Sequence, residues 1–231
     1  MSQTLAVVGT DTGVGKTVVA AGLILGAQRR GRGVAAFKAV ETGLDPADPQ
    51  QTVSGEPADW ARLSALTGQG RAALGVAYEL PAAPLAAALS SSRPVPVAAL
   101  EQRLSRLQQE NDLVVLEGAG GFLVPVQPEV LWADLVQRWA TRVVLVGRLG
   151  LGTINHTLLT LESLRRRKID CAFVQLSATE PTGPEAPQTI DMISQFCKYP
   201  LLEPLPYDLT KPSDVATHLE RSGALDLVLA G

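Results

Sequence analysis

The stretch Gly9-Thr-Asp-Thr-Gly-Val-Gly-Lys-Thr17 decides how this chain folds. It follows the apolar run Leu5–Val8 and opens the segment Lys16–Arg30, which carries alanine and leucine at helical spacing and stops at Gly31. A glycine-rich turn between a buried strand and a helix is the setting in which backbone N–H groups bind phosphate oxygens. The stretch therefore predicts a phosphate-binding loop.

The spacing inside this loop departs from the standard phosphate loop. The standard pattern has four residues between its first glycine and the Gly-Lys pair, and here Thr10 stands where that glycine is expected. Lys16 is still placed to reach the β- and γ-phosphates of a nucleotide, and the Thr17 hydroxyl is placed to bind Mg²⁺. A glycine turn without a ligand is the weaker alternative.

Apolar runs bounded by glycine alternate with helical segments along the rest of the chain. Such alternation predicts an α/β fold, with a mostly parallel central sheet and helices on both faces in three layers. Two proline-containing segments, 45–57 and 179–187, follow strands and are predicted as loops, where open α/β sheets bind their ligands. The further strands are predicted at 33–40, 113–117, 143–146 and 171–176, and the further helices at 100–110 and 153–168.

Composition narrows the class of protein. The 231 residues favour one domain over 1–231, with two small domains as the alternative. Apolar residues (46%) and charged residues (19%) exclude a disordered chain, and the net charge of −3 argues against nucleic acid as the main partner. No apolar run reaches about 18 residues, so we expect no membrane span. The two cysteines are too few for a disulfide framework and no signal peptide is recognisable, so we expect a cytosolic protein.

Aromatic residues make up only 4% of the chain, which predicts that backbone groups and charged side chains hold the ligand.

Two charged residues lie at the ends of predicted strands. Glu117 closes the strand 113–117, where a carboxylate can hold Mg²⁺; a solvated or helix-facing glutamate is the alternative. Lys38 lies near the end of the strand 33–40, where a lysine points into the ligand crevice and can stabilise a carboxylate or a phosphoryl group in transfer. From the residues alone, a surface lysine explains Lys38 equally well.

Together these motifs resemble those of the dethiobiotin synthetase family, whose members use ATP to close the ureido ring in biotin synthesis. The resemblance rests on the phosphate loop, on Lys38-Ala-Val-Glu-Thr-Gly43, on Glu117-Gly-Ala-Gly-Gly121 with Val124-Pro125, and on Gly150-Leu-Gly-Thr-Ile-Asn-His156. It covers the chain well from residue 5 to about 165 and the remainder weakly. The resemblance implies a P-loop ligase that takes 7,8-diaminononanoate, CO₂ and ATP with Mg²⁺, and works as a homodimer with the substrate site at the interface.

The resemblance also implies roles for individual residues. Lys38 and Lys16 would be catalytic, and Thr17, Asp59 and Glu117 would hold the metal; a plain helix N-terminal carboxylate is the alternative for Asp59. The residues that would bind ATP are Gly13, Val14, Gly15, Lys16, Thr17, Val18, Asp59, Glu117, Gly118, Ala119, Gly120, Leu205, Pro206 and Tyr207. The residues that would bind the diamine are Thr12, Thr42, Gly152, Thr153, Ile154 and Asn155, the last four at a helix N-terminus.

Three positions depart from the family pattern. Ala39 replaces a proline, and Pro81-Ala-Ala-Pro-Leu85 lacks the serine and histidine usual near the substrate. Leu176 stands about where an asparagine reads adenine, which predicts relaxed base selectivity, with Tyr207 either stacking on the base or lying on the surface. For His156 we expect capping or packing in a helix rather than proton transfer.

Three other interpretations remain at this stage. ParA/MinD-like ATPases carry a loop lysine where this chain has Asp11, which counts against that class. Cobyrinate amidating enzymes carry a glutaminase domain with a nucleophilic cysteine, for which this chain is too short. An inactive member of the dethiobiotin synthetase family is the third.

Overall fold

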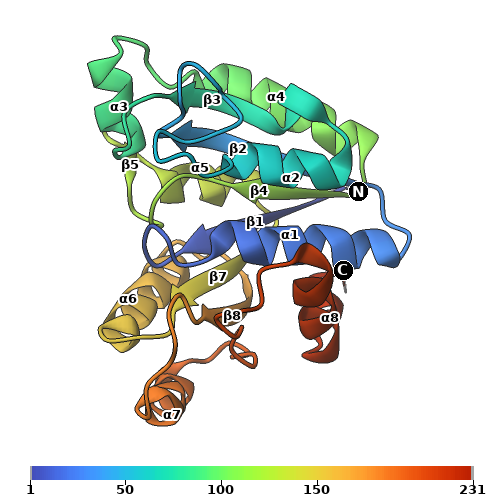
Figure 1. The fold of residues 1–231 in the computed structure, drawn as a ribbon, viewed down its shortest axis with the longest axis vertical. Helices are drawn as coiled ribbons and strands as arrows, with labels where there is room; N and C mark the ends of the chain where they lie inside the picture. The colour runs from blue at the N-terminus through green and yellow to red at the C-terminus, as the bar shows by residue number, and fades with distance from the viewer. Residues whose placement is uncertain (1, 230–231) are drawn as a thin grey trace.

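The central element of the fold is a six-stranded parallel sheet in the order β3-β2-β4-β1-β7-β8 (Figure 1). The computed structural model describes residues 2–229. The sheet comprises β1 (Gln3–Gly9), β2 (Val34–Thr42), β3 (Leu74–Tyr78), β4 (Leu113–Glu117), β7 (Arg142–Arg148) and β8 (Cys171–Ser177). A short antiparallel pair, β5 (Pro125–Gln127) and β6 (Val130–Leu131), lies outside it. The predicted parallel α/β sheet is confirmed.

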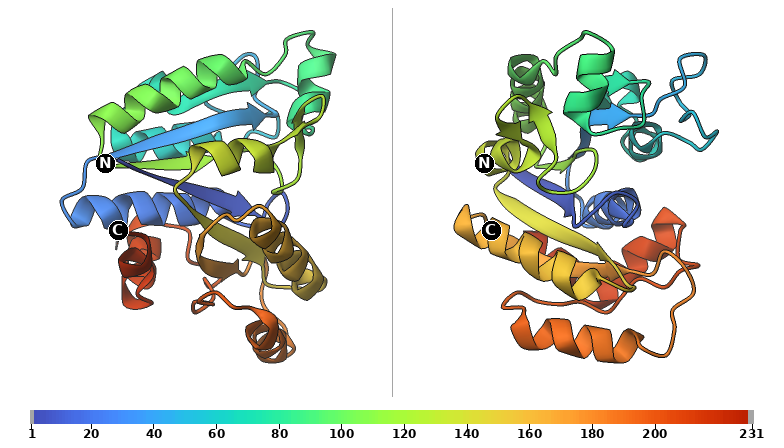
Figure 2. Two further views of the ribbon diagram at one scale, coloured as in Figure 1. Left: turned by 180° about the vertical axis from the view of Figure 1, so that it is seen from behind. Right: turned by 90° about the vertical axis from the view of Figure 1, so that its left-hand side faces the viewer.

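Helices cover both faces of this sheet, because successive residues of the strands point to opposite sides. Leu5 and Val7 pack in one apolar cluster, and Ala6 and Val8 in the other. The helices that contribute to the first cluster are α1 (Lys16–Arg29), α2 (Asp59–Thr67), α8 (Pro212–Arg221) and α9 (Ala224–Leu229). Those that contribute to the second are α3 (Pro84–Ser90), α4 (Val97–Glu110), α5 (Trp132–Trp139), α6 (Thr153–Arg166) and α7 (Ala186–Phe196), several of them seen from behind in Figure 2.

The predicted bounds differ from the structure in two informative places. The strand β2 continues to Thr42, so Lys38 lies inside it and not at its end. An unpaired charge is too costly to bury within a strand, so a charged residue normally marks the end of a buried strand. Lys38 is tolerated inside β2 because two carboxylates pair with it. The second predicted loop is shorter than expected, because α7 begins at Ala186 and accepts Pro187 in its first turn, where a missing N–H costs little.

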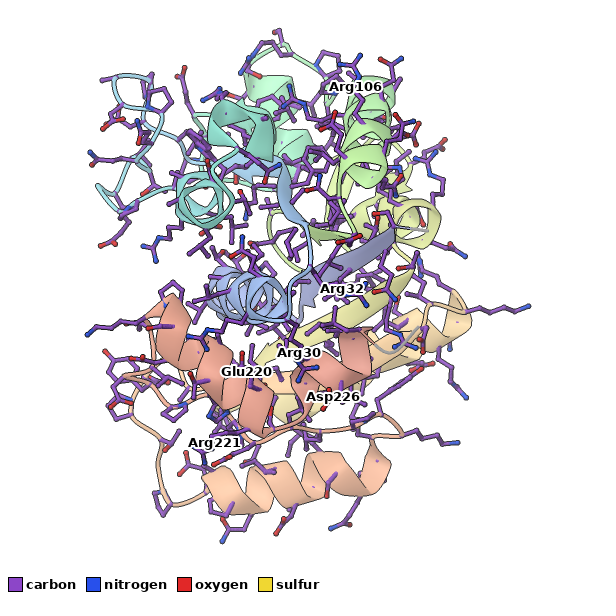
Figure 3. All side chains as sticks on the ribbon, turned by 90° about the vertical axis from the view of Figure 1, so that its right-hand side faces the viewer. Arg30, Arg32, Arg106, Glu220, Arg221 and Asp226 are labelled. Carbon is purple, nitrogen blue, oxygen red and sulfur yellow. The ribbon has the colours of Figure 1, made fainter. Side chains whose placement is uncertain are left out.

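The C-terminal helices are tied to the helix that follows the phosphate loop. A Cβ atom at Gly22 of α1 would lie 2.4 Å from Val215 Cγ1 of α8. Because glycine has no Cβ, α1 and α8 can pack closely at this point. Arg30 pairs with Asp226 at 2.5 Å, at the end of the molecule seen in Figure 3. The segment that resembles the family least therefore stabilises the element that carries the loop. In residues 2–229 no helix is both long and apolar enough to cross a bilayer.

Candidate active site

The phosphate loop ends in the first turn of α1. Gly13 and Gly15 have φ values of 70° and 92°, a region that glycine enters without steric cost. Gly15 caps the helix without a side chain, which leaves the first N–H groups of α1 available to an anion. Val14 is buried in the core, so only its backbone is available to a phosphate.

Lys16, the first residue of α1, folds back over the loop. Its Nζ donates a hydrogen bond to the Asp11 carbonyl oxygen at 3.0 Å. Burial lowers the pKa of Lys16, and the Glu117 carboxylate offsets this only in part. The ammonium group is therefore already partly desolvated, which strengthens its attraction to a bound phosphate.

Lys38 lies between two carboxylates at the bottom of the adjoining cleft. Its Nζ is 2.7 Å from Oδ2 of Asp59 and 2.6 Å from Oε1 of Glu117, and its side chain is only 2% exposed. Burial lowers the pKa of Lys38, but the two carboxylates outweigh burial and raise the pKa above its ordinary value. The interpretation as a surface lysine is wrong, and a charged lysine is built into the site.

Glu117 has the unpartnered oxygen that a cation ligand requires. Its Oε1 accepts hydrogen bonds from Lys38 and from the Thr17 hydroxyl, the latter at 2.9 Å. Its Oε2 is buried and has no hydrogen-bond partner within residues 2–229. Burial raises the pKa of Glu117, with the Lys38 ammonium opposing that rise. Buried polar atoms are normally paired, so this oxygen indicates a ligand.

Asp59 completes a donor set that fits Mg²⁺. Burial raises the pKa of Asp59, but the Lys38 ammonium outweighs burial, and the pKa lies below its ordinary value. Asp59 is also the first residue of α2, so the alternative interpretation as a helix N-terminal carboxylate is confirmed, and its role as a metal ligand stays a prediction. Mg²⁺ in phosphate-transferring sites typically binds one or two protein carboxylates and is completed by phosphate and water. Among the described residues, no three His, Cys, Asp or Glu side chains are placed so as to hold a metal ion.

Most of the predicted site residues share this cleft of about 390 Å³. Its predicted members are Thr12, Gly13, Gly15, Lys16, Thr17, Val18, Lys38, Thr42, Asp59, Glu117, Gly118, Ala119 and Gly120. A second pocket of about 250 Å³ shares Gly13, Gly15 and Val18 and holds the remaining ATP-binding candidates Leu205, Pro206 and Tyr207. The side chain of Tyr207 is 54% exposed, which leaves it available to a base.

Leu176 does not belong to the second pocket, and the expectation that it replaces a base-reading side chain is wrong. It is fully buried in the apolar cluster on the far face of the sheet. Its neighbour Ser177 lines the pocket instead, and the Ser177 Oγ is buried without a partner in the described part of the chain. The alternation of side chains along β8 could have predicted the place of Ser177. It lies four positions after Phe173 and therefore on the same side of the sheet, and Phe173 packs in the apolar cluster that includes α1.

The four remaining substrate candidates lie at the N-terminus of α6, outside both pockets. Gly152 caps this helix with φ 86°, Thr153 is buried, Ile154 is half-buried and Asn155 is exposed. His156 is exposed as well, so of the capping or packing expected for it, packing is contradicted and capping stays a prediction. Among the described residues, this helix end therefore does not share the cleft that contains Lys38.

Among the cleft residues that were not predicted as site residues, Glu41 is the most buried. Glu41 is 3% exposed, and its two oxygens accept the backbone N–H groups of Asp59 and Trp60 at 2.6 and 3.0 Å. Burial raises the pKa of Glu41 to about 7, with the Lys38 ammonium opposing the rise. Glu41 lies within the motif Lys38-Ala-Val-Glu-Thr-Gly43, but no role could be read for it there, because its partners lie in another element.

The parallel sheet, the phosphate loop and the acidic strand end together define a P-loop ATPase fold. The family model described as "AAA domain" matches residues 3–212. Cobyrinic acid a,c-diamide synthase from Mycobacterium smegmatis has a TM-score of 0.53 at 17% identity, covering 97% of this chain and 94% of that one. The septum site-determining protein MinD from Pyrococcus horikoshii, complexed with Mg-ADP, has a TM-score of 0.51 at 14% identity, covering 99% and 93%. At these identities the likeness establishes the fold alone.

Sequence relatives establish the particular family. An ATP-dependent dethiobiotin synthetase BioD from Anaeromyxobacter dehalogenans is 36% identical over 230 residues, 98% of this chain and 96% of the relative. One from Aquifex aeolicus is 33% identical over 233 residues, 98% of this chain and 97% of the relative. The chain belongs to the family of ATP-dependent dethiobiotin synthetases, and it is an ATP-dependent ligase of biotin synthesis.

Proposed function

We propose that this protein, as one domain over residues 1–231, converts 7,8-diaminononanoate and CO₂ to dethiobiotin with ATP, releasing ADP and phosphate. One amine of the substrate takes up CO₂ as a carbamate. A carbamate oxygen attacks the γ-phosphorus, and the bond to the β–γ bridging oxygen breaks to release ADP. The second amine then attacks the carbonyl carbon of the mixed anhydride, the ring closes, and phosphate leaves.

The observation that carries this proposal is the buried Lys38 ammonium beside the phosphate loop. Phosphoryl transfer to a carbamate needs positioning and charge stabilisation rather than a protein nucleophile. Lys38 and Lys16 both line the cleft, so two cationic groups face the space where carbamate and γ-phosphate would meet. A desolvated, preorganised cation stabilises charge that develops in the transition state more strongly than water does.

The metal fits the same arrangement. Thr17, Asp59 and Glu117 would hold Mg²⁺, and the buried unpartnered Glu117 Oε2 supports this. When bound, the metal neutralises negative charge on the phosphates. The first N–H groups of α1, from Gly15 onward, bind the phosphate oxygens and orient the chain of phosphates along the cleft.

The exposed N-terminus of α6 supports a site shared between two copies. Leu151, directly before the helix cap Gly152, is 98% exposed, and Leu159, within α6, is 55% exposed. A second copy that covered this helix end would bury these two side chains, and burial of apolar surface is favourable. In a homodimer, the N–H groups of Ile154 and Asn155 in the first turn of α6 would receive the carboxylate of the diamine bound beside the other copy's Lys38.

The test is a measurement of ADP release with diaminononanoate, bicarbonate and MgATP. ADP release that requires the diamine, with dethiobiotin identified as the product, is the expected result. ATP turnover that is indifferent to the diamine would overturn the proposal. Omitting bicarbonate under CO₂-free conditions is the matched control, because ring closure takes its carbonyl carbon from CO₂.

A further inference from the structure

The helix α2, which carries Asp59, lacks a cap of its own. Its N-cap residue is Ala58, whose backbone has the extended geometry of a cap (φ −62°, ψ 145°) but whose side chain cannot accept a hydrogen bond. Ser, Thr, Asp or Asn normally stands at such a position and satisfies the first N–H groups of the helix. Glu41, from the strand β2, takes over this task with both of its oxygens.

Lys38 and Glu41 reach α2 by different routes. The pairing of β2 with β3 keeps one register from Lys38 to Thr42, so residues three positions apart in this strand start on opposite sides of the sheet. Both nevertheless contact the first residue of α2, Lys38 through the Asp59 side chain and Glu41 through the Asp59 backbone N–H.

We propose that Glu41 is a positioning residue, which caps α2 from the neighbouring strand and thereby holds the Asp59 carboxylate against Lys38. The proposal rests on the function proposed above. A carboxylate at a helix N-terminus is favoured by the helix dipole, so the contact is stabilising as well as orienting. Glu41 acts on the reaction through Asp59 and not by touching the reacting groups.

The geometry argues against a direct role for Glu41. Both of its oxygens already accept backbone N–H groups, at 2.6 and 3.0 Å, and its side chain is almost fully buried. A group that bound the diamine or a cation would need oxygen lone pairs directed into the cleft. The unpartnered oxygen in this cleft belongs to Glu117 instead.

The test is a double-mutant cycle between Glu41→Ala and Asp59→Asn, measured as kcat and KM for MgATP. We expect Glu41→Ala to lower kcat/KM by about 10- to 100-fold, because small displacements of catalytic groups have effects of that size. In the Asp59→Asn background the same change should cost less than about twofold, since its effect passes through Asp59. Equal, multiplicative losses in both backgrounds would overturn the proposal.

A rescue variant separates capping from direct contact. Ala58→Ser supplies a local cap, and we expect Glu41→Ala/Ala58→Ser to recover most of the lost kcat/KM, while Ala58→Ser alone stays near the unsubstituted protein. If Glu41 touched the diamine, the KM for diamine would rise and Ala58→Ser would not restore it. Glu41→Gln, which keeps the shape and one acceptor, should fall between, and serves where Glu41→Ala does not fold.

A matched control addresses general destabilisation. Asp134 stabilises the N-terminus of α5 from within its own first turn, with Oδ2 accepting the N–H of the N-cap residue Leu131 at 2.8 Å, and it lies outside the cleft. Asp134→Ala should lower thermal stability comparably and leave kcat/KM unchanged below the unfolding temperature. Affinity for Mg-ADP, measured by calorimetry without diamine, should weaken in Glu41→Ala and recover with Ala58→Ser. The affinity for Mg-ADP can be measured even if the protein shows no diamine-dependent turnover. The positioning role of Glu41 and the proposed function can therefore be tested separately.

Discussion

Lys38 of β2 and Glu117 of β4 are direct partners in the register of the central sheet, and their side chains meet at 2.6 Å. Two adjacent parallel strands thus deliver opposite charges to one point in the interior. A buried ion pair of this kind is costly to form and contributes little net stability. The ion pair is better explained by function, because it keeps the Lys38 ammonium charged and fixed in position to stabilise negative charge on a substrate.

Replacing Lys38 should separate binding from chemistry. We expect Lys38→Met to lower kcat by about 10²- to 10³-fold, the usual cost of losing one electrostatic donor, while ADP still binds. Lys38→Ala should have the same effect on kcat, and both variants should lower the free energy of unfolding by about 3–5 kcal/mol, because each leaves the buried Glu117 carboxylate without its cationic partner. Steady-state kinetics and calorimetric ADP titration check both variants. Near-normal turnover in Lys38→Met would remove the role assigned to this lysine.

Replacing Glu117 should act through the metal. Glu117→Gln keeps the shape of the side chain and removes its charge, so we expect the Mg²⁺ concentration for half-maximal turnover to rise by about tenfold or more. Binding of metal-free ADP should change little. A titration of activity against Mg²⁺ at saturating ATP measures this. An unaltered Mg²⁺ requirement would show that Glu117 is not a ligand.

Base preference should depend on Ser177 and not on Leu176. Ser177→Ala removes the buried hydroxyl from the wall of the second pocket, and we expect the KM for the nucleotide to rise by about five- to tenfold, the equivalent of about 1 kcal/mol. Leu176→Met, a volume-conserving change on the other face, should leave the relative KM values for ATP, GTP and CTP unchanged. Comparing these three nucleotides in both variants decides the point. A shift in nucleotide preference in Leu176→Met would contradict the assignment.

The contact between α1 and α8 should be sensitive to one methyl group. In an open helix, replacing glycine by alanine stabilises by about 1 kcal/mol, but at Gly22 the new Cβ would overlap Val215. We therefore expect Gly22→Ala to lower the free energy of unfolding by about 1–3 kcal/mol. In Gly22→Ala/Val215→Ala the loss should be smaller than the sum of the two single losses. Urea unfolding of the four proteins provides the cycle, and additive losses would rule out the overlap.

The thiols should be protected in the native protein. Burial raises the pKa of Cys171 to about 12, and it also raises the pKa of the half-buried Cys197. Since the thiolate is the reactive form, an alkylating reagent at pH 7.5 should leave Cys171 unmodified and react slowly at Cys197. Mass spectrometry before and after denaturation measures this, with both thiols labelled only after unfolding. Rapid native labelling of Cys171 would mean that β8 opens.

Sequence patterns predicted the sheet and the phosphate loop well, since both depend on neighbours in the chain. The strand at 113–117 agrees with the structure residue for residue, because it is a continuous apolar run between turns. Prediction was poorer where a buried charge interrupted the pattern, as at Lys38. It was also poorer for α8, whose apolar face becomes apparent only against α1.

The sequence by itself determined the phosphate loop, the class of fold and the identity of the charged candidates. These features depend on contiguous residues, whose spacing and backbone freedom are local properties. Only the tertiary structure decided which candidates meet. Lys38 lies 21 positions from Asp59 and 79 from Glu117, and the pairing of β2 with β4 and the packing of α2 beside β2 bring all three together. The faces on which Glu41, Leu176 and Ser177 lie were likewise decided by strand pairing, because a shift of one residue in a strand moves a side chain to the opposite side of the sheet.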